Sequence, residues 1–155
     1  MAAESRYRER LRPPWWLWLV CLALAASMGL VWLVVVGPVG ALLIAVALAA
    51  VAWWGLWRWS ATVEVTDTEL RVGRAHIPLA LTGPAVPLDR ERAAWARGPG
   101  IDPAAYHLIR GWVPTAVLID VVDPADPTPY WYVATRRPRE LAAAVDSARQ
   151  EANGR

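Results

Sequence analysis

Residues 13–57 carry no charged side chain and consist almost wholly of Leu, Val, Ala, Trp and Gly. One bilayer crossing takes about 20 apolar residues. A run of 45 residues therefore predicts two membrane-spanning helices joined by a tight reversal. Gly37, Pro38 and Gly40 are turn formers near its middle, so we expect spans of about 15–36 and 39–57.

Tryptophan positions favour the same arrangement. Indoles open the run at Trp15, stand near its middle at Trp32 and close it around Trp57. Tryptophan prefers the headgroup boundary of a bilayer. A hairpin places most of these side chains at a boundary, whereas a single crossing would leave several in the hydrocarbon.

Small residues recur at helical spacing in both predicted spans, at Cys21, Ala25, Gly29, Gly37, Ala41, Ala45 and Ala49. Such faces let helix backbones approach closely. Two interpretations remain open: the faces pack against each other within the hairpin, or they join a homo-oligomer or a larger membrane protein. The most polar side chain in the spans is Ser27, so an ion pathway, which usually requires an ionisable side chain that faces a cavity, is not expected through them.

After Ser60 the pattern changes to period-two alternation, which is typical of strands. The expected strands are Ala61–Val65, Glu69–Val72, a stretch within Ala75–Leu81, Tyr106–Arg110, Thr115–Val122 and Tyr130–Thr135. Pro84 and Pro87 predict a loop. Asp89 is placed to cap a helix over 90–96, and a last helix is expected from Pro138 to about Glu151, with Leu141, Val145 and Ala148 on one face.

This order predicts an α+β membrane protein: a two-helix transmembrane hairpin followed by a small antiparallel β-sheet or partial barrel closed by a C-terminal helix. The element order resembles the pleckstrin-homology-like superfold. The expected divisions are a basic cytoplasmic tail (1–12), the hairpin (13–59) and a cytoplasmic α+β domain (60–155).

Charge sets the predicted orientation. Arg6, Arg8, Arg10 and Arg12 precede the apolar run, and Arg58 follows it. Positive flanks remain cytoplasmic, so we expect a multi-pass protein of the cell inner (plasma) membrane with both termini inside. Beyond residue 57, 12 Arg face 12 carboxylates. Without a basic face on that domain, no nucleic-acid partner is expected.

The residues that could carry chemistry are few. Cys21 is the only cysteine, which excludes an intrachain disulfide and a thiolate metal site. Asp120, Asp123 and Asp126 could surround a cation or, with His107, form an enzyme site, but Asp-Pro pairs are ordinary turn formers. His76 likewise has no sequence neighbour that would make it a general base. We therefore predict no enzyme activity, no cofactor and no metal.

Arg136, Arg137 and Arg139 form the densest basic cluster outside the tail. Together with Trp131 they are the candidate contacts to anionic lipid or to a partner. The alternative is a solvated edge on which Glu140 compensates the charge.

A resemblance covers nearly the whole chain. It is carried by Tyr7-Arg8-Glu9-Arg10-Leu11 with Pro13-Pro14-Trp15-Trp16, Arg97-Gly98-Pro99-Gly100 with Asp102-Pro103 and Tyr106, Asp123-Pro124-Ala125-Asp126-Pro127-Thr128-Pro129-Tyr130-Trp131, and Thr135-Arg136-Arg137-Pro138 with Leu141. The chain resembles a family of small, alanine-rich actinobacterial membrane proteins known only as a domain of unknown function. The resemblance implies two spans and a cytoplasmic domain, and it supplies no catalytic residues.

The expected function is that of a membrane-tethered interaction or scaffolding module. The bilayer is one partner, and a membrane protein or a second copy, reached through the small-residue helix faces, is another. A domain that binds anionic lipid headgroups is the first alternative, and an enzyme with a site around Asp120, Asp123, Asp126 and His107 is the second.

Overall fold

The structure is a computed structural model that describes residues 5–154. The chain divides into two compact units, an apolar unit over 12–60 and a polar unit made from the segments on both sides of it. The segment before residue 12, which the sequence predicts as a separate tail, belongs to the same unit as the segment that follows residue 60.

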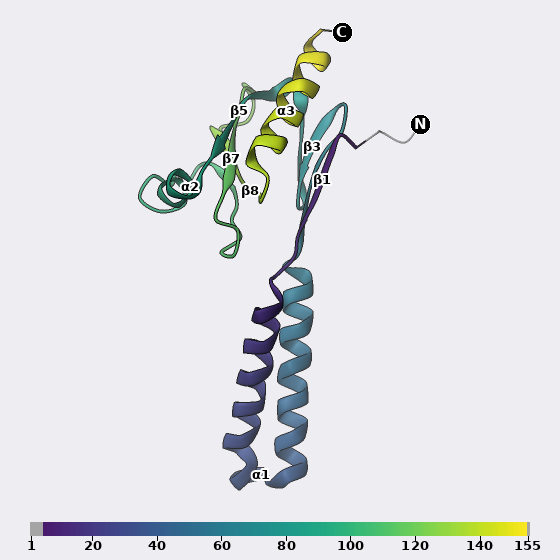
Figure 1. Cartoon of the computed structure of the whole chain (residues 1–155), viewed down its shortest axis with the longest axis vertical. Helices are drawn as coiled ribbons and strands as arrows, with labels where there is room; N and C mark the ends of the chain where they lie inside the picture. Colours follow the sequence, from purple (N-terminus) through teal and green to yellow (C-terminus); the bar gives the residue numbers. More distant parts are fainter. Residues whose placement is uncertain (1–4, 155) are drawn as a thin grey trace. The chain divides into compact units, whose positions relative to one another are not determined.

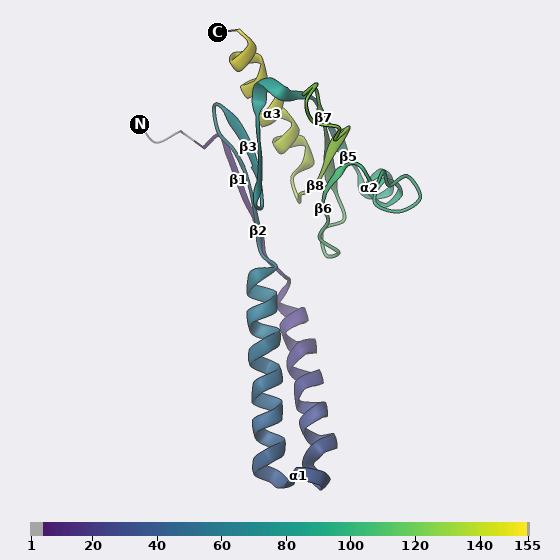
Figure 2. The same ribbon diagram turned by 180° about the vertical axis from the view of Figure 1, so that it is seen from behind.

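The apolar unit is the helical element α1, Trp15–Arg58, shown at the bottom of Figure 1. Its one non-helical residue is Gly37, with φ 73° and ψ 176°, a conformation that only glycine adopts readily. The chain reverses at Gly37. This is shown by the distance of 4.5 Å between the ring centroids of Trp18, before Gly37, and Trp53, after it. Both ribbon views show the two halves of α1 side by side (Figures 1 and 2).

The expectation of two separate helices needs correction. The structure has one helical element, which is interrupted at Gly37 and continues from Pro38, a residue that suits the first turn of a helix. Among the helices of residues 5–154, α1 is the one long and apolar enough to cross a membrane by length and composition.

The two halves of α1 pack through small residues. A Cβ placed on Gly29 would lie 2.8 Å from Cβ of Ala45 and 3.0 Å from the carbonyl oxygen of Ala41. Ala25 and Ala41 are also buried. This confirms the interpretation in which the small faces meet within the segment, and the large apolar side chains consequently point outward.

The first sheet of the polar unit has four antiparallel strands in the order β1-β2-β3-β4. Its strands are β1 Tyr7–Leu11, β2 Ala61–Val65, β3 Glu69–Val72 and β4 Ala75–Pro78. Strands β2 and β3 have the predicted bounds, and β4 lies within the predicted stretch before the 3-10 turn η1, Leu79–Leu81.

Strand β1 corrects the prediction of a basic tail over 1–12. Tyr7 pairs with Val65 and Leu11 pairs with Ala61, so the segment before α1 completes the sheet. Tyr7, Glu9 and Leu11 face inward, and Arg8 and Arg10 face solvent. The sequence pattern did not predict this strand, because Glu9, a charged residue, occupies its central inward position.

The second sheet has the order β5-β7-β8-β6, with β5 Thr82–Leu88, β6 Tyr106–Leu108, β7 Ala116–Val121 and β8 Tyr130–Ala134. The predicted loop around Pro84 and Pro87 is instead strand β5. Proline is tolerated there because β5 is an edge strand with an irregular register between Thr82 and Ala85. Strand β6 runs parallel to β8, so the expected wholly antiparallel sheet is also corrected.

The helices agree with the sequence. Helix α2, Arg90–Ala96, begins after Asp89, whose side chain accepts a hydrogen bond from the Arg92 amide at 2.9 Å. Helix α3, Pro138–Asn153, buries Leu141, Val145 and Ala148 in a core shared by the two sheets. Figures 1 and 2 show α3 between those sheets. The α+β class with a closing C-terminal helix is confirmed.

Candidate functional site

The predicted basic cluster lies at the start of α3, where Arg136, Arg137 and Arg139 are all exposed. Arg137 Nη1 donates to Glu140 Oε2 at 3.1 Å, and this bond raises the pKa of Arg137. The predicted compensation by Glu140 is therefore present. An exposed pair of this kind contributes little to stability.

Trp131 does not belong to a contact surface. Its side chain is 6% exposed and its ring lies 4.6 Å from that of Tyr106, inside the core that includes α3. Tyr132 points to the other face, where its hydroxyl donates to the Ala93 carbonyl of α2 at 3.2 Å. The prediction of a Trp131 contact is wrong, because both faces of β8 are covered.

The aspartates around the β7–β8 connection form turns. Asp123 Oδ1 accepts from the Ala125 amide, and Asp126 Oδ1 accepts from the Thr128 amide, both at 2.9 Å. The bonds to Thr128 also lower the pKa of Asp126. Within residues 5–154, no group of three or more His, Cys, Asp or Glu residues is arranged to hold a metal ion.

The histidines lie on separate strands. His107 packs between Tyr130 and Tyr132, at centroid distances of 6.2 and 6.1 Å, and its Nε2 atom is buried without a hydrogen-bond partner in the described part of the chain. His76 is exposed on β4. The ring contacts of His107 are thus with tyrosines, whereas Asp120 lies exposed on β7.

A buried carboxylate network on β1 was not predicted from the sequence. Glu9 is 6% exposed. Its Oε2 accepts from the Tyr7 hydroxyl at 2.7 Å and from Thr135 Oγ1 at 2.5 Å, and its Oε1 accepts from the Arg136 amide at 3.1 Å. We call these four residues the Glu9 network. A buried carboxylate is tolerated only when donors satisfy it, and here three donors do so.

Electrostatics reinforce the position of β1. Burial raises the pKa of Tyr7, so its hydroxyl remains a donor to Glu9. One residue before the strand, Arg6 donates to Asp67 at 2.6 Å and to Glu151 at 2.7 Å. These bonds raise the pKa of Arg6. Hydrogen bonds therefore connect the β1 segment to both ends of α3, through Glu151 near its end and through Arg136 just before its start.

The Glu9 network positions a strand and leaves no open carboxylate. The alternation of Tyr7 and Leu11 is the sequence signal that could have revealed β1. The partners of Glu9 could not be found that way, because Thr135 lies 126 residues further along the chain.

A family model described as "Protein of unknown function (DUF3093)" matches residues 6–145. The chain belongs to the DUF3093 family. The DUF3093 match extends from the residue before β1 into α3, so it includes both the apolar unit and the strand in front of it. This confirms the expected membership of a family of unknown function.

No curated protein and no solved structure matches the chain. The likeness to the pleckstrin-homology-like superfold therefore rests on element order alone, and the parallel pairing of β6 with β8 departs from a wholly antiparallel sheet.

Proposed function

We propose that this DUF3093 chain crosses a bilayer twice through α1 and holds its polar unit at one membrane face as a non-catalytic interaction or scaffolding module. The observation that carries the proposal is the pairing of Leu11 with Ala61, the strand residues nearest to the two ends of α1.

Strand pairing restricts how α1 can cross a membrane. Strands β1 and β2 belong to one sheet, so both must lie on the same side of the bilayer. The segment between them must then cross an even number of times. The reversal at Gly37 leaves about 20 residues on each side, and about 20 residues suffice for one crossing at 1.5 Å per residue.

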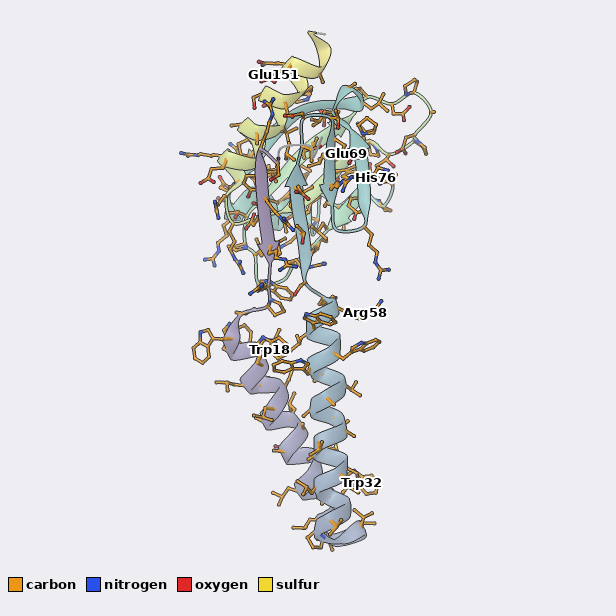
Figure 3. All side chains as sticks on the ribbon, turned by 90° about the vertical axis from the view of Figure 1, so that its right-hand side faces the viewer. Trp18, Trp32, Arg58, Glu69, His76 and Glu151 are labelled. Atoms are coloured by element: carbon orange, nitrogen blue, oxygen red, sulfur yellow. The ribbon has the colours of Figure 1, made fainter. Side chains whose placement is uncertain are left out.

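The surface of α1 supports a lipid environment. In an apolar stretch of 18 residues within α1, 11% of the residues are buried. Exposed apolar surface of that extent marks a membrane or a protein interface. Arg58, the last residue of α1, stands 5.1 Å over the ring of Trp54. Figure 3 shows Trp32 near the opposite end of the unit, towards the reversal.

The cytoplasmic side is favoured by charge. Arg8, Arg10, Arg12 and Arg58 lie within a few residues of the ends of α1. Arginine close to a span resists translocation. Confinement of the polar unit beside the cytoplasmic leaflet raises its effective concentration for other membrane-bound molecules, which is the physical basis of a tethering function.

The test uses single cysteines and a membrane-impermeant maleimide. In a Cys21→Ser background, Ser5→Cys and Gly154→Cys are expected to react only after the cells are opened. Val39→Cys, beside the reversal, is expected to react in intact cells. Opposite accessibility of Ser5→Cys and Gly154→Cys would overturn the proposal, as would labelling of Val39→Cys from the same side as both.

A second candidate function is contact with anionic lipid headgroups through Arg136, Arg137 and Arg139. Their joint exposure at one end of α3 favours it. A fluorophore attached at Arg139→Cys in the Cys21→Ser background should be shielded from a soluble quencher in phosphatidylglycerol nanodiscs and accessible in phosphatidylcholine nanodiscs. Equal quenching in both would remove this candidate.

A further inference from the structure

The solvent face of the β1–β4 sheet carries an excess of basic side chains. Its register aligns one residue from each strand in a single row, Arg8, Glu64, Arg71 and His76. Side chains of directly paired residues lie about 5 Å apart at Cβ. Arg10 and Arg74 add two further positive charges beside this row.

A hollow of about 280 Å³ opens on this face at the β3–β4 turn. It is lined by Glu69, Arg71, Gly73, Arg74, Ala75 and His76. The turn has two residues, and its first, Gly73, has φ 64°, a value that favours glycine. Because the turn is tight, Arg74 stands directly beside the ends of both strands. Figure 3 labels Glu69 and His76, which lie on these two neighbouring strands.

Glu69 fixes one edge of the Arg71 guanidinium. Arg71 Nε donates to Glu69 Oε1 at 2.6 Å, and Nη2 pairs with the same oxygen. A guanidinium has five N–H donors, so the edge that includes Nη1 retains donors that Glu69 does not use. The Arg71 side chain is 58% exposed and that of Glu69 is 24% exposed. The carboxylate is therefore the more deeply placed partner and the guanidinium is the more accessible one.

We propose that this hollow, which we call the β3–β4 hollow, binds the phosphate group of an anionic ligand. The free edge of Arg71 has the planar fork geometry that recognises phosphate oxygens in pairs. Arg74 supplies a second positive charge, and the His76 imidazole supplies a ring N–H donor. Glu69 acts as a positioning residue, since its Oε1 accepts from Nε of Arg71 and orients the guanidinium.

Two sources of phosphate share this chemistry, a phospholipid headgroup and a soluble phosphate ester. A phospholipid source rests on the proposed function, in which Arg10 on β1 precedes the membrane-spanning Trp15 by five residues of chain. The hollow nevertheless binds phosphate irrespective of whether α1 crosses a bilayer. Failure of the membrane topology test and failure of the phosphate test are therefore separate results.

The experiment uses the full chain, labelled with ¹⁵N, in uncharged detergent micelles. Inorganic phosphate is titrated at constant ionic strength against chloride, and amide shifts are followed by NMR. We expect saturable shifts at Gly73, Arg74, Ala75 and His76. Arg74→Gln and Arg71→Gln should each weaken binding at least fivefold. Arg90→Gln, an exposed arginine on α2, removes the same charge elsewhere and should leave binding unchanged.

A second arm identifies the source of the phosphate. The same amides are compared in phosphatidylcholine nanodiscs with and without phosphatidylglycerol. Shifts that appear with phosphatidylglycerol and are lost in Arg74→Gln indicate a headgroup, and shifts with inorganic phosphate alone indicate a soluble ester. The proposal is overturned if neither addition shifts these amides, or if Arg90→Gln weakens binding as much as Arg74→Gln does.

Discussion

Thr135 Oγ1 donates a hydrogen bond to Glu9 Oε2 at 2.5 Å, across 126 residues of sequence. Glu9 precedes the apolar helix and Thr135 follows it, so this bond closes the polar unit around the insertion of α1. Thr135 Oγ1 also accepts from the Arg137 amide at 3.1 Å. One hydroxyl therefore ties β1 to the start of α3.

Removal of that hydroxyl should destabilise the polar unit. Thr135→Val keeps the side-chain shape but leaves Glu9 and the Arg137 amide each without one partner. We expect the free energy of unfolding to fall by about 1–3 kcal/mol, the usual cost of a buried polar group left unsatisfied. Urea denaturation followed by tyrosine and tryptophan fluorescence measures the change.

Thr62→Val is the matched control for this substitution. Thr62 lies on the solvent face of β2, opposite Arg10. We expect its replacement to change the free energy of unfolding by less than about 0.5 kcal/mol. Equal losses in Thr62→Val and Thr135→Val would contradict the assigned role of the Glu9 network.

The polar unit should fold without α1 if β1 is kept. Because Leu11 pairs with Ala61, replacement of residues 12–60 by a short Asn-Gly turn would join β1 to β2 as a hairpin. We expect a soluble protein with a cooperative thermal transition in the absence of detergent. Circular dichroism and size-exclusion chromatography test this expectation.

The comparison for that variant is the segment 61–155 alone. It lacks the buried side chains of Tyr7 and Leu11 and leaves Thr135 without Glu9. We expect it to aggregate or to lose its cooperative transition. A well-folded 61–155 segment would show that β1 is dispensable, contrary to the structure.

The contrast between β1 and β2 illustrates what the sequence could predict. Strand β2 has apolar residues at every inward position, and the sequence predicts its bounds correctly. Strand β1 has Glu9 at an inward position, and its stability depends on donors from Thr135 and Arg136, in the connection between β8 and α3. Local periodicity contains no information about such distant partners. The same reason explains the missed strand β5, whose prolines are accepted only because it lies at a sheet edge.

Candidate sites were predicted less well than the fold. The exposure of Arg136 could be expected from a charged segment at a helix start, whereas the burial of Trp131 depends on which element covers each face of β8. The row of Arg8, Glu64, Arg71 and His76 on the first sheet could not be predicted, for a related reason. Arg8 and His76 become neighbours in one row only when the register of all four strands is known.

Close packing inside α1 gives a prediction for Gly29. A valine at this position would clash with Ala45, whose Cβ lies 2.8 Å from the position of an added Cβ. We expect Gly29→Val to lower the stability of the full chain in detergent by about 1–3 kcal/mol, as for other overpacked sites.

Gly55→Ala is the control, because an added Cβ there meets nothing within 4 Å. Gly55→Ala should be neutral or stabilising, since alanine favours helix. A greater loss in Gly55→Ala than in Gly29→Val would contradict this packing.

Alkaline pH should destabilise the polar unit through its buried tyrosines. Burial raises the pKa of Tyr7, Tyr106 and Tyr132. Above about pH 10 the unfolded chain loses phenolic protons that the folded chain retains. The stabilisation is thus complete below that pH and is lost as the pH rises. Each such tyrosine contributes a slope of about 1.4 kcal/mol per pH unit to the decrease in unfolding free energy.

A single substitution tests the origin of this slope. Tyr132 is fully buried, and Tyr132→Phe removes its phenol while keeping the ring in the core. The unfolding free energy of Tyr132→Phe should therefore fall less steeply between pH 10 and 12 than that of the unsubstituted chain. The difference in slope should be about the contribution of one tyrosine. Urea denaturation at a series of pH values measures both slopes. Identical slopes, or a stability that stays constant up to pH 12, would show that these phenols do not govern the alkaline limit.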